Sequence, residues 1–270
     1  MGSGLPDPTP AKRALSPRAI PGLHFNPGFR IPDDVAEGVR RACMEQYFRP
    51  TDGDPTGKPK FNQVQLFGLC TLSPALQGFI VTLAELMRPH LSPELHDLLF
   101  NPDYPEPSQH KQDLCSPSST TPSTSSAAPK RHRQAILNLY EPGEGITPHV
   151  DLENRYGDGI VGVSLGSGCV MNFRHDLRGQ HDLYLPKNSV VVMTDEARFL
   201  WQHGIEGREV DLVEGEQRQM GMIKRGTRLS ITFRWLLPEV VPDPPDAACD
   251  GEPYLFEEDE EDESEIPLFV

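Results

Sequence analysis

Seven short β-rich segments succeed one another in the second half of the chain, between residues 134 and 237. In order they are "QAILNLY", "GIVGVSL", "CVMNFRH", "HDLYLP", "SVVVMT", "RFLWQHGI" and "RLSITFRWLL", and turn residues separate them. No helical pattern lies between them. Spacing of this kind is typical of an antiparallel barrel or a two-sheet jelly roll. This half of the chain therefore predicts a β core.

Helical and mixed patterns come before these segments. Residues 31–48 and 72–90 are predicted to be helices, the second with Ser73 as its N-cap and Pro74 at its first helical position. Residues 60–68 alternate apolar and polar side chains, which predicts a strand. We therefore expect an α+β chain with a β core, a double-stranded β-helix (jelly roll), with the N-terminal helices packed outside it.

Three segments are expected to lie outside the packed part of a single domain that spans residues 21–236. Residues 1–20 are rich in proline and glycine and predict a disordered arm. Residues 101–131 are rich in serine, threonine and proline and predict a disordered insertion within the domain. Residues 237–270 predict an acidic disordered tail.

The net charge of −15 is concentrated in that tail. Of the 40 acidic residues, 13 lie in residues 236–270, which contain no Lys or Arg, so the rest of the chain has a net charge of −2. A nucleic-acid substrate is therefore not excluded. The basic clusters "KRHR" (130–133) and "IKRGTR" (223–228) would attract phosphate locally. For the first cluster taken alone, a solvated basic run is the preferred interpretation, and a nuclear-localisation or phosphate-contacting patch is the alternative.

The cysteines and the apolar runs bear on where the chain works. Five cysteines are scattered with no Cys-x-x-Cys pair: Cys43, Cys70, Cys115, Cys169 and Cys249. An odd, dispersed set argues for reduced thiols, hence cytoplasm or nucleus, and against a structural zinc site. No apolar run approaches the roughly 18 residues of a membrane span, and no secretory signal is visible. We expect no membrane association.

His149 and Asp151 stand two residues apart in "ITPHVD". In an extended strand, positions i and i+2 point to the same face, so an imidazole and a carboxylate would converge. His203, in "FLWQHGI", is the best-placed third ligand, although a histidine taken alone is more often a core or surface residue. Two histidines and one carboxylate leave three positions open on an octahedral metal, which is the arrangement of non-heme Fe(II) oxygenases.

Arg228 and Arg234 stand six residues apart in the last β-rich segment, so on a strand they share one face with Ser230 and Thr232. An open iron site needs an electron source, which a 2-oxo acid supplies. The distal carboxylate of such an acid needs a fixed cation, best an arginine. The alternative is an edge strand whose arginines are solvated.

The ordered set "NLYEPGEGITPHVD", "WQHGI" and "RLSITFR" resembles the AlkB family of Fe(II)/2-oxoglutarate dioxygenases. The pattern is Asn-x-Tyr, then His-x-Asp, then a distant His, then Arg-x5-Arg. The resemblance covers residues 134–236 strongly and 60–68 weakly. It extends to the AlkB-homologue branch that includes the tRNA wobble-uridine hydroxylase, and to fungal proteins of similar layout. It implies that His149, Asp151 and His203 bind Fe(II).

The same resemblance implies a site for 2-oxoglutarate. Arg228 would hold the distal carboxylate, helped by Tyr140. Asn138 and Arg234 would lie near the C1 carboxylate and the iron ligands. Arg208, in the long loop before the last strand, is a rival for the role of Arg228, but its use would leave the Arg-x5-Arg pattern unexplained.

The resemblance also indicates where a substrate would lie. In the family the segment before the β core forms a lid over the target base, and "KFNQVQLFG" occupies that place. Asn62 and Gln63 are therefore candidate substrate contacts, with ordinary strand residues as the alternative.

Together these features predict an Fe(II)- and 2-oxoglutarate-dependent dioxygenase. We expect an oxidative demethylase or hydroxylase of a modified nucleobase in DNA or RNA. Single strands would be preferred, because a base must leave its stack to react. The alternatives are the same chemistry on a protein side chain and a non-catalytic jelly-roll binding module.

Overall fold

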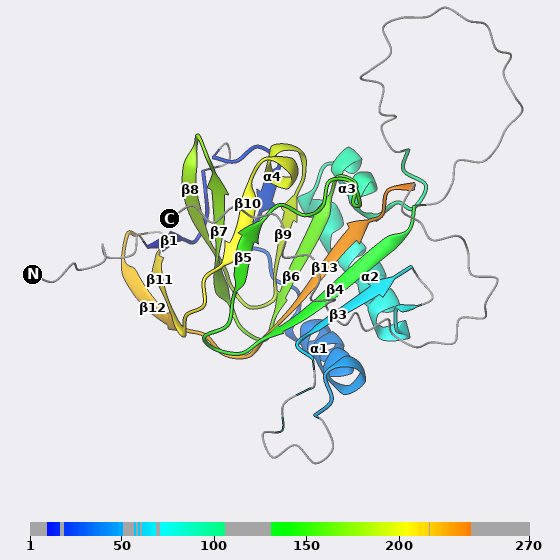
Figure 1. The fold of residues 1–270 in the computed structure, drawn as a ribbon, viewed down its shortest axis with the longest axis horizontal. Coiled ribbons are helices and arrows are strands. Elements are labelled where there is room, and N and C mark those ends of the chain that lie inside the picture. The colour runs from blue at the N-terminus through cyan, green and yellow to red at the C-terminus, as the bar shows by residue number, and fades with distance from the viewer. Residues whose placement is uncertain are drawn as a thin grey trace, which may run out of the picture.

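Two β-sheets form the body of the protein, and helices cover the outer face of one of them (Figure 1). The computed structural model describes residues 10–16, 19–50, 57, 59, 61–68, 71–105, 131–215 and 217–238. In spatial order, the seven-stranded sheet consists of β12 (Met220–Lys224), β11 (Val210–Glu214), β1 (Ala11–Lys12), β8 (Gly179–Leu185), β7 (Cys169–His175), β10 (Gln202–Ile205) and β5 (Ile146–His149). The six-stranded sheet consists of β2 (Leu23–Phe25), β9 (Ser189–Met193), β6 (Ile160–Leu165), β13 (Arg228–Trp235), β4 (Arg133–Tyr140) and β3 (Gln63–Phe67).

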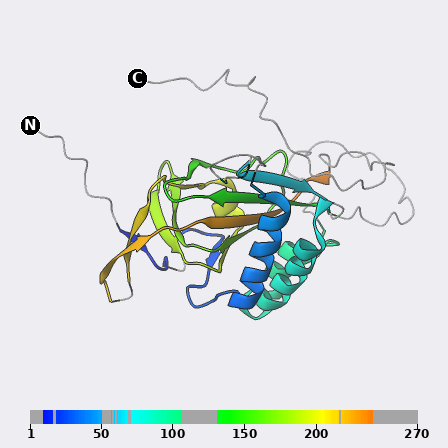
Figure 2. The same ribbon diagram turned by 90° about the horizontal axis from the view of Figure 1, so that it is seen from below.

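The helical layer consists of α1 (Asp33–Tyr47), α2 (Pro74–Met87), the short 3-10 helix η2 (Arg88–His90) and α3 (Pro93–Phe100). Figure 2 shows these helices stacked beneath the strands of the six-stranded sheet. The hydroxyl of Ser73 accepts a hydrogen bond from the amide of Leu76 at 3.3 Å and Pro74 opens the helix, as the sequence predicted for α2. The predicted α+β class, with a jelly-roll β core and N-terminal helices outside, is confirmed.

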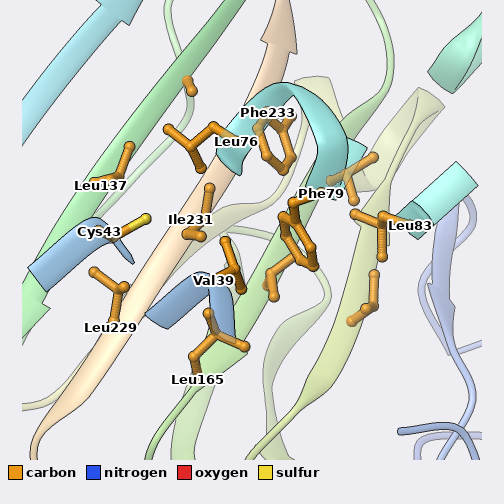
Figure 3. Close-up of a cluster of buried hydrophobic side chains, with 14 of the residues drawn as sticks. Val39, Cys43, Leu76, Phe79, Leu83, Leu137, Leu165, Leu229, Ile231 and Phe233 are labelled. Atoms are coloured by element: carbon orange, nitrogen blue, oxygen red, sulfur yellow. The ribbon is translucent and has the colours of Figure 1, made fainter. Parts of the chain in front are cut away.

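The largest apolar core lies between these helices and the six-stranded sheet (Figure 3). Leu229, Ile231 and Phe233 alternate along β13 and point to the helices. From the helical side they meet Val39, Cys43, Leu76, Phe79 and Leu83. Burial of one such side chain contributes roughly 1.5–3 kcal/mol. The helices are therefore held by the odd-numbered face of β13.

The opposite face of β13 is polar and points toward the seven-stranded sheet, because side chains alternate along a strand. It presents Arg228, Ser230, Thr232 and Arg234. Since β13 lies between β4 and β6, it is a central strand, and both arginines are only 5% exposed. The alternative of an edge strand with solvated arginines is wrong, because pairing on both sides places the polar face inside the sandwich.

A second apolar cluster joins the two sheets. Phe173 and Leu183 of the seven-stranded sheet pack with Ile160, Val191 and Met193 of the six-stranded sheet. Trp201, which is fully buried, belongs to this cluster and lies two residues before His203. The polar residues between the sheets are thus flanked by a rigid apolar region, which limits how far the strands that hold them can move.

The ends of the chain depart in one respect from the sequence-based expectations. Within the predicted arm of residues 1–20, Ala11–Lys12 forms β1, parallel to both β11 and β8, and Ala11 is 2% exposed. This part of the arm prediction is wrong, because β1 pairs with strands far along the chain, which local composition does not reveal. Residues 1–9, most of the predicted insertion (106–130) and the acidic tail from residue 239 lie outside the described residues. Among the described helices, none has the length and apolar character needed to cross a membrane.

Candidate metal centre

Three predicted metal ligands come together at the ends of two paired strands. His149 is the last residue of β5 and lies directly opposite His203 of the antiparallel strand β10, with their ring centroids 4.6 Å apart. Asp151 follows β5, and its Oδ2 lies 3.7 Å from Nε2 of His203. The candidate ligand atoms of all three lie within 4.8 Å of one another, and no other such cluster occurs in the described part of the chain. The structure therefore brings the predicted triad into one small volume.

The unused atoms of this triad suit a divalent cation. The carbonyl oxygen of Thr147 lies 2.8 Å from Nδ1 of His149, which places the proton on Nδ1 and leaves Nε2 as a free lone pair. Oδ2 of Asp151 is buried and has no hydrogen-bond partner. A bare, buried carboxylate oxygen is costly, and a metal ion would satisfy it.

The second histidine is kept neutral by its surroundings. Burial lowers the pKa of His203 to about 4, against the opposing effect of the nearby Asp151 carboxylate. A neutral imidazole is the form that binds a metal, so no proton has to be displaced from His203 at neutral pH. The site is therefore prepared for a cation and not for an internal ion pair.

Two arginines fix the position of Asp151 from different sides. Arg234 of β13 forms a buried ion pair with Oδ1 of Asp151. Arg198, from the short helix α4 (Asp195–Phe199), donates to the Asp151 carbonyl oxygen at 2.9 Å. Arg198 also donates to the carbonyl oxygen of Tyr156 at 3.0 Å, so it holds both ends of the loop that contains the ligand. The sequence offered no signal for Arg198, because its partners are backbone groups 41 to 47 positions away.

Arg228 lies at the other end of β13 and is prepared for an anion. Its Nε donates to Ser164 Oγ at 2.8 Å and its Nη2 to Ser230 Oγ at 3.4 Å. Its Nη1 is buried without a partner, and among the described residues no carboxylate pairs with it. The guanidinium lies 5.4 Å from the ring of Tyr140, whose pKa is raised by burial, so that its hydroxyl stays a donor. This arrangement fits a carboxylate that enters from outside the chain.

The rival arginine is occupied elsewhere. Arg208 forms an ion pair with Glu206, and its Nε lies 3.6 Å from Oδ1 of Asp211. Asp211 also forms a two-point ion pair with Arg225, whose Nε and Nη2 each donate to one carboxylate oxygen at 2.7 Å. Arg208 therefore belongs to a local cluster of charges, and Arg228 is the better candidate for the 2-oxoglutarate carboxylate.

The two candidate substrate residues, Asn62 and Gln63, make different kinds of contact. Gln63 is exposed on the edge strand β3, and its amide donates to Oδ1 of Asn138 at 2.7 Å. Gln63 and Asn138 therefore share the face that points between the sheets. Asn62 is exposed just before β3, and its carbonyl oxygen accepts from the amide of Leu139 at 2.7 Å. The contact that involves Asn62 is thus a backbone one.

The two basic clusters of the sequence do not form phosphate-attracting surfaces through their arginines. Arg131 and Arg133 are buried and lie over the ring of Trp235, at 4.5 and 3.7 Å from its centroid. Arg225 is buried in its ion pair with Asp211. The expectation that these clusters attract phosphate is wrong for these arginines, because packing and pairing remove them from the surface.

Arg155, four residues after Asp151, lies close to two aromatic rings. The guanidinium carbon of Arg155 lies 5.3 Å from the ring centroid of Phe67 on edge strand β3 and 5.8 Å from that of Tyr156. Tyr156 also lies under Arg234, at 3.9 Å. Aromatic rings and guanidinium groups thus alternate from β3 inward, in the order Phe67, Arg155, Tyr156, Arg234. The last of them forms the ion pair with Asp151. We call Phe67, Arg155 and Tyr156 the rim.

Comparisons with known proteins agree with this chemistry. Residues 103–234 match the sequence model of the 2OG-Fe(II) oxygenase superfamily. The uncharacterized protein L905 of Acanthamoeba polyphaga mimivirus is 41% identical over 110 residues, which cover 40% of this chain and 50% of that protein. The tRNA (carboxymethyluridine(34)-5-O)-methyltransferase ALKBH8 of Mus musculus is 41% identical over 112 residues, which cover 37% of this chain and 17% of that protein. The matched stretch thus spans half or less of either relative.

Among solved structures, a prolyl-4-hydroxylase from Pseudomonas putida is similar with a TM-score of 0.44 and 13% identity, over 80% of this chain and 92% of that one.

Proposed function

We propose that the chain is an AlkB-type Fe(II)- and 2-oxoglutarate-dependent dioxygenase acting on a modified nucleobase, and the match of residues 103–234 to the sequence model of the 2OG-Fe(II) oxygenase superfamily supports this proposal. The observation that carries the proposal is that two sites between the two sheets each contain a buried charged atom without a partner. One is the triad with the bare Oδ2 of Asp151, and the other is the unpartnered Nη1 of Arg228. The first needs a cation and the second needs an anion.

In the mechanism, the triad would hold the metal. His149 through Nε2, Asp151 through Oδ2 and His203 would be the protein ligands. Bound together, Fe(II) and 2-oxoglutarate would supply oxygen activation, in which O2 is the oxidant, the oxo acid is converted to succinate and CO2 with one oxygen atom, and the other oxygen atom enters a C–H bond of the substrate. On an N-methyl group, the hydroxylated product releases formaldehyde.

The remaining residues orient the cosubstrate. Arg228 would bind the distal carboxylate through Nη1, while Ser164 and Ser230 keep its guanidinium in place. The Tyr140 hydroxyl, protonated at neutral pH, would donate to the same carboxylate. Asn138, opposite Ser230 on the same face of the sheet, would contact the C1 carboxylate, and its side-chain oxygen is held by Gln63.

Access to the metal would be from the side of His149. The side chains of Asp151 and His203 are 7% and 11% exposed, whereas His149 is half-buried on β5, which ends its sheet. Strand β3, with the rim residue Phe67, ends the other sheet. A substrate entering between two edge strands would meet no intervening strand.

The rim favours a nucleobase as the substrate. Phe67 on the edge strand β3 offers an aromatic face on which a flat base can stack, and Arg155 offers a cation for a base or a phosphate. Tyr156 is only 4% exposed and supports this pair from the interior, against Arg155 and Arg234. Of the relatives, ALKBH8 is named as a tRNA methyltransferase, and only the substrate class, nucleic acid, is taken from it. A base in a single strand is the easiest to extract, so single-stranded substrates would react fastest.

The test is a panel of methylated single-stranded DNA, methylated RNA and methyl-lysine peptides, with succinate and formaldehyde as readouts. We expect both products with nucleic acid, and neither in His149→Ala. Turnover of peptides alone would support the protein-side-chain alternative. A folded protein that binds neither Co(II) nor 2-oxoglutarate by calorimetry would support the non-catalytic binding module.

A further inference from the structure

A hydrogen-bonded pair of side chains lies behind the metal ligand Asp151. Gln134 of β4 is directly opposite Arg234 of β13 in the sheet register. Its Oε1 accepts a hydrogen bond from Nε of Arg234 at 3.1 Å, while Nη1 of the same guanidinium contacts Oδ1 of Asp151. Gln134 is 0% exposed. It therefore touches the residue that touches the ligand, and solvent does not reach it.

The other end of Gln134 is anchored to the edge strand. Its Nε2 donates to Oε1 of Gln65 on β3 at 3.1 Å, and Gln65 in turn donates to Gln63 at 3.3 Å. A guanidinium can only donate, so the amide oxygen of Gln134 must face Arg234 and its nitrogen must face Gln65. The orientation of this amide is thus dictated by chemistry, and both of its ends are satisfied.

Three contacts consequently fix the guanidinium of Arg234: Gln134 at Nε, Asp151 at Nη1, and the ring of Tyr156 at 3.9 Å. With Oδ1 of Asp151 held by Arg234, Oδ2 is left bare toward His203. We propose that Gln134 is a positioning residue of the metal centre, which holds Arg234 so that Asp151 offers one defined oxygen to a divalent metal. This inference rests on the proposed function, because it needs the triad to bind a metal.

The alternative is that Gln134 only fills space between the sheets. For filling space alone, a buried amide is less favourable than an apolar side chain, because the amide needs a hydrogen-bond partner at each end and the apolar side chain needs none. Partners that orient a ligand from behind typically change metal affinity by 10- to 100-fold when they are lost. A space-filling role predicts no such change.

Two substitutions separate these roles. Gln134→Met keeps a similar volume but removes both hydrogen bonds, so Arg234 loses one of its three fixed contacts. Gln134→Glu keeps the shape but adds a carboxylate that competes with Asp151 for the guanidinium. The probe is Co(II), added to the metal-free full-length chain without oxygen, because its visible absorption reports both affinity and coordination geometry.

We expect the dissociation constant for Co(II) to rise about tenfold or more in both variants. We also expect the Co(II) bands to change in position or intensity, because Asp151 is free to bind through either or both oxygens. Asn172→Leu is the matched control. Asn172 is 1% exposed and donates to Asp182 at 2.8 Å, and among the described residues no hydrogen bond joins it to Arg234. This variant should lose stability and leave the Co(II) spectrum unchanged.

The outcomes distinguish this inference from the proposed function. If the wild-type chain binds Co(II) and both Gln134 variants bind it with the same affinity and spectrum, the positioning role is overturned while the proposed function stands. If the wild-type chain does not bind Co(II), the proposed function fails and the inference fails with it. If Gln134→Met unfolds before it can be titrated, the isosteric Gln134→Glu decides.

Discussion

Replacing Arg228 with methionine is the most direct perturbation of the 2-oxoglutarate site. Nη1 of Arg228 is buried without a partner, and the guanidinium is held by Ser164 and Ser230, so little ordering is needed when a carboxylate arrives. A hydrogen bond between charged groups contributes roughly 1.5–3 kcal/mol. At about 1.4 kcal/mol per tenfold, Arg228→Met should weaken 2-oxoglutarate binding by about 10- to 150-fold.

The assay is calorimetric titration of 2-oxoglutarate into the Co(II)-loaded protein without oxygen. A second titrant, 2-oxovalerate, has the same chain length but no distal carboxylate. Wild-type protein should strongly prefer 2-oxoglutarate, and Arg228→Met should lose most of that preference while it binds 2-oxovalerate nearly as before.

Arg208→Met is the matched control, because Arg208 is engaged with Glu206 and Asp211. It should leave both affinities within about twofold, a change of less than 0.5 kcal/mol. If Arg208→Met lost the preference and Arg228→Met kept it, the assignment of the distal carboxylate to Arg228 would be refuted. Equal losses in both variants would refute the claim that one arginine is prepared for the anion.

Three further predictions follow from the geometry. Co(II) at a hundredfold excess over its dissociation constant should stabilise the protein by about 2.7 kcal/mol in denaturant unfolding, and a chelator or Asp151→Asn should remove that gain, because the metal binds only the folded triad; an equal gain in Asp151→Asn would place the metal elsewhere. Arg155→Ala should weaken single-stranded RNA binding and lower its salt dependence by about one counterion, with unchanged 2-oxoglutarate affinity, as measured by fluorescence anisotropy at several salt concentrations; an unchanged salt slope would remove Arg155 from the substrate path. Phe79→Ala should cost about 3–5 kcal/mol in the free energy of unfolding, because it empties the core between α2 and β13; a loss under 1 kcal/mol would show that the helices are not held there.

Much of the site was predictable because it is local or repeats along one strand. His149 and Asp151 are two residues apart, and this spacing predicted that they converge, although β5 ends at His149 and Asp151 is positioned by Arg198 and Arg234 in the loop that follows. The same argument places Arg228 and Arg234 on one face of β13. The spacing of the turns predicted the β core, and Ser73 with Pro74 predicted the start of α2.

What the sequence could not reveal depends on which strands become neighbours. Arg234 reaches Asp151 across 83 positions and Gln134 across 100, and no local pattern encodes these partners. Arg198 has no distinguishing sequence context. Its role depends on the loop of residues 151–157, whose carbonyl oxygens accept its hydrogen bonds.

The sequence by itself therefore determined the kinds of ligand present and their faces, because side-chain direction alternates strictly along a strand. Only the tertiary structure decided which charges are buried and what they touch. Arg131 and Arg133 belong to a basic run of the sequence and are buried against Trp235. Arg228 could equally have been solvated, but it is buried, and no acidic residue in the described part of the chain pairs with it. The physical reason is that the pairing of a buried charge is set by the strands on either side, and in this sandwich those strands come from distant parts of the chain.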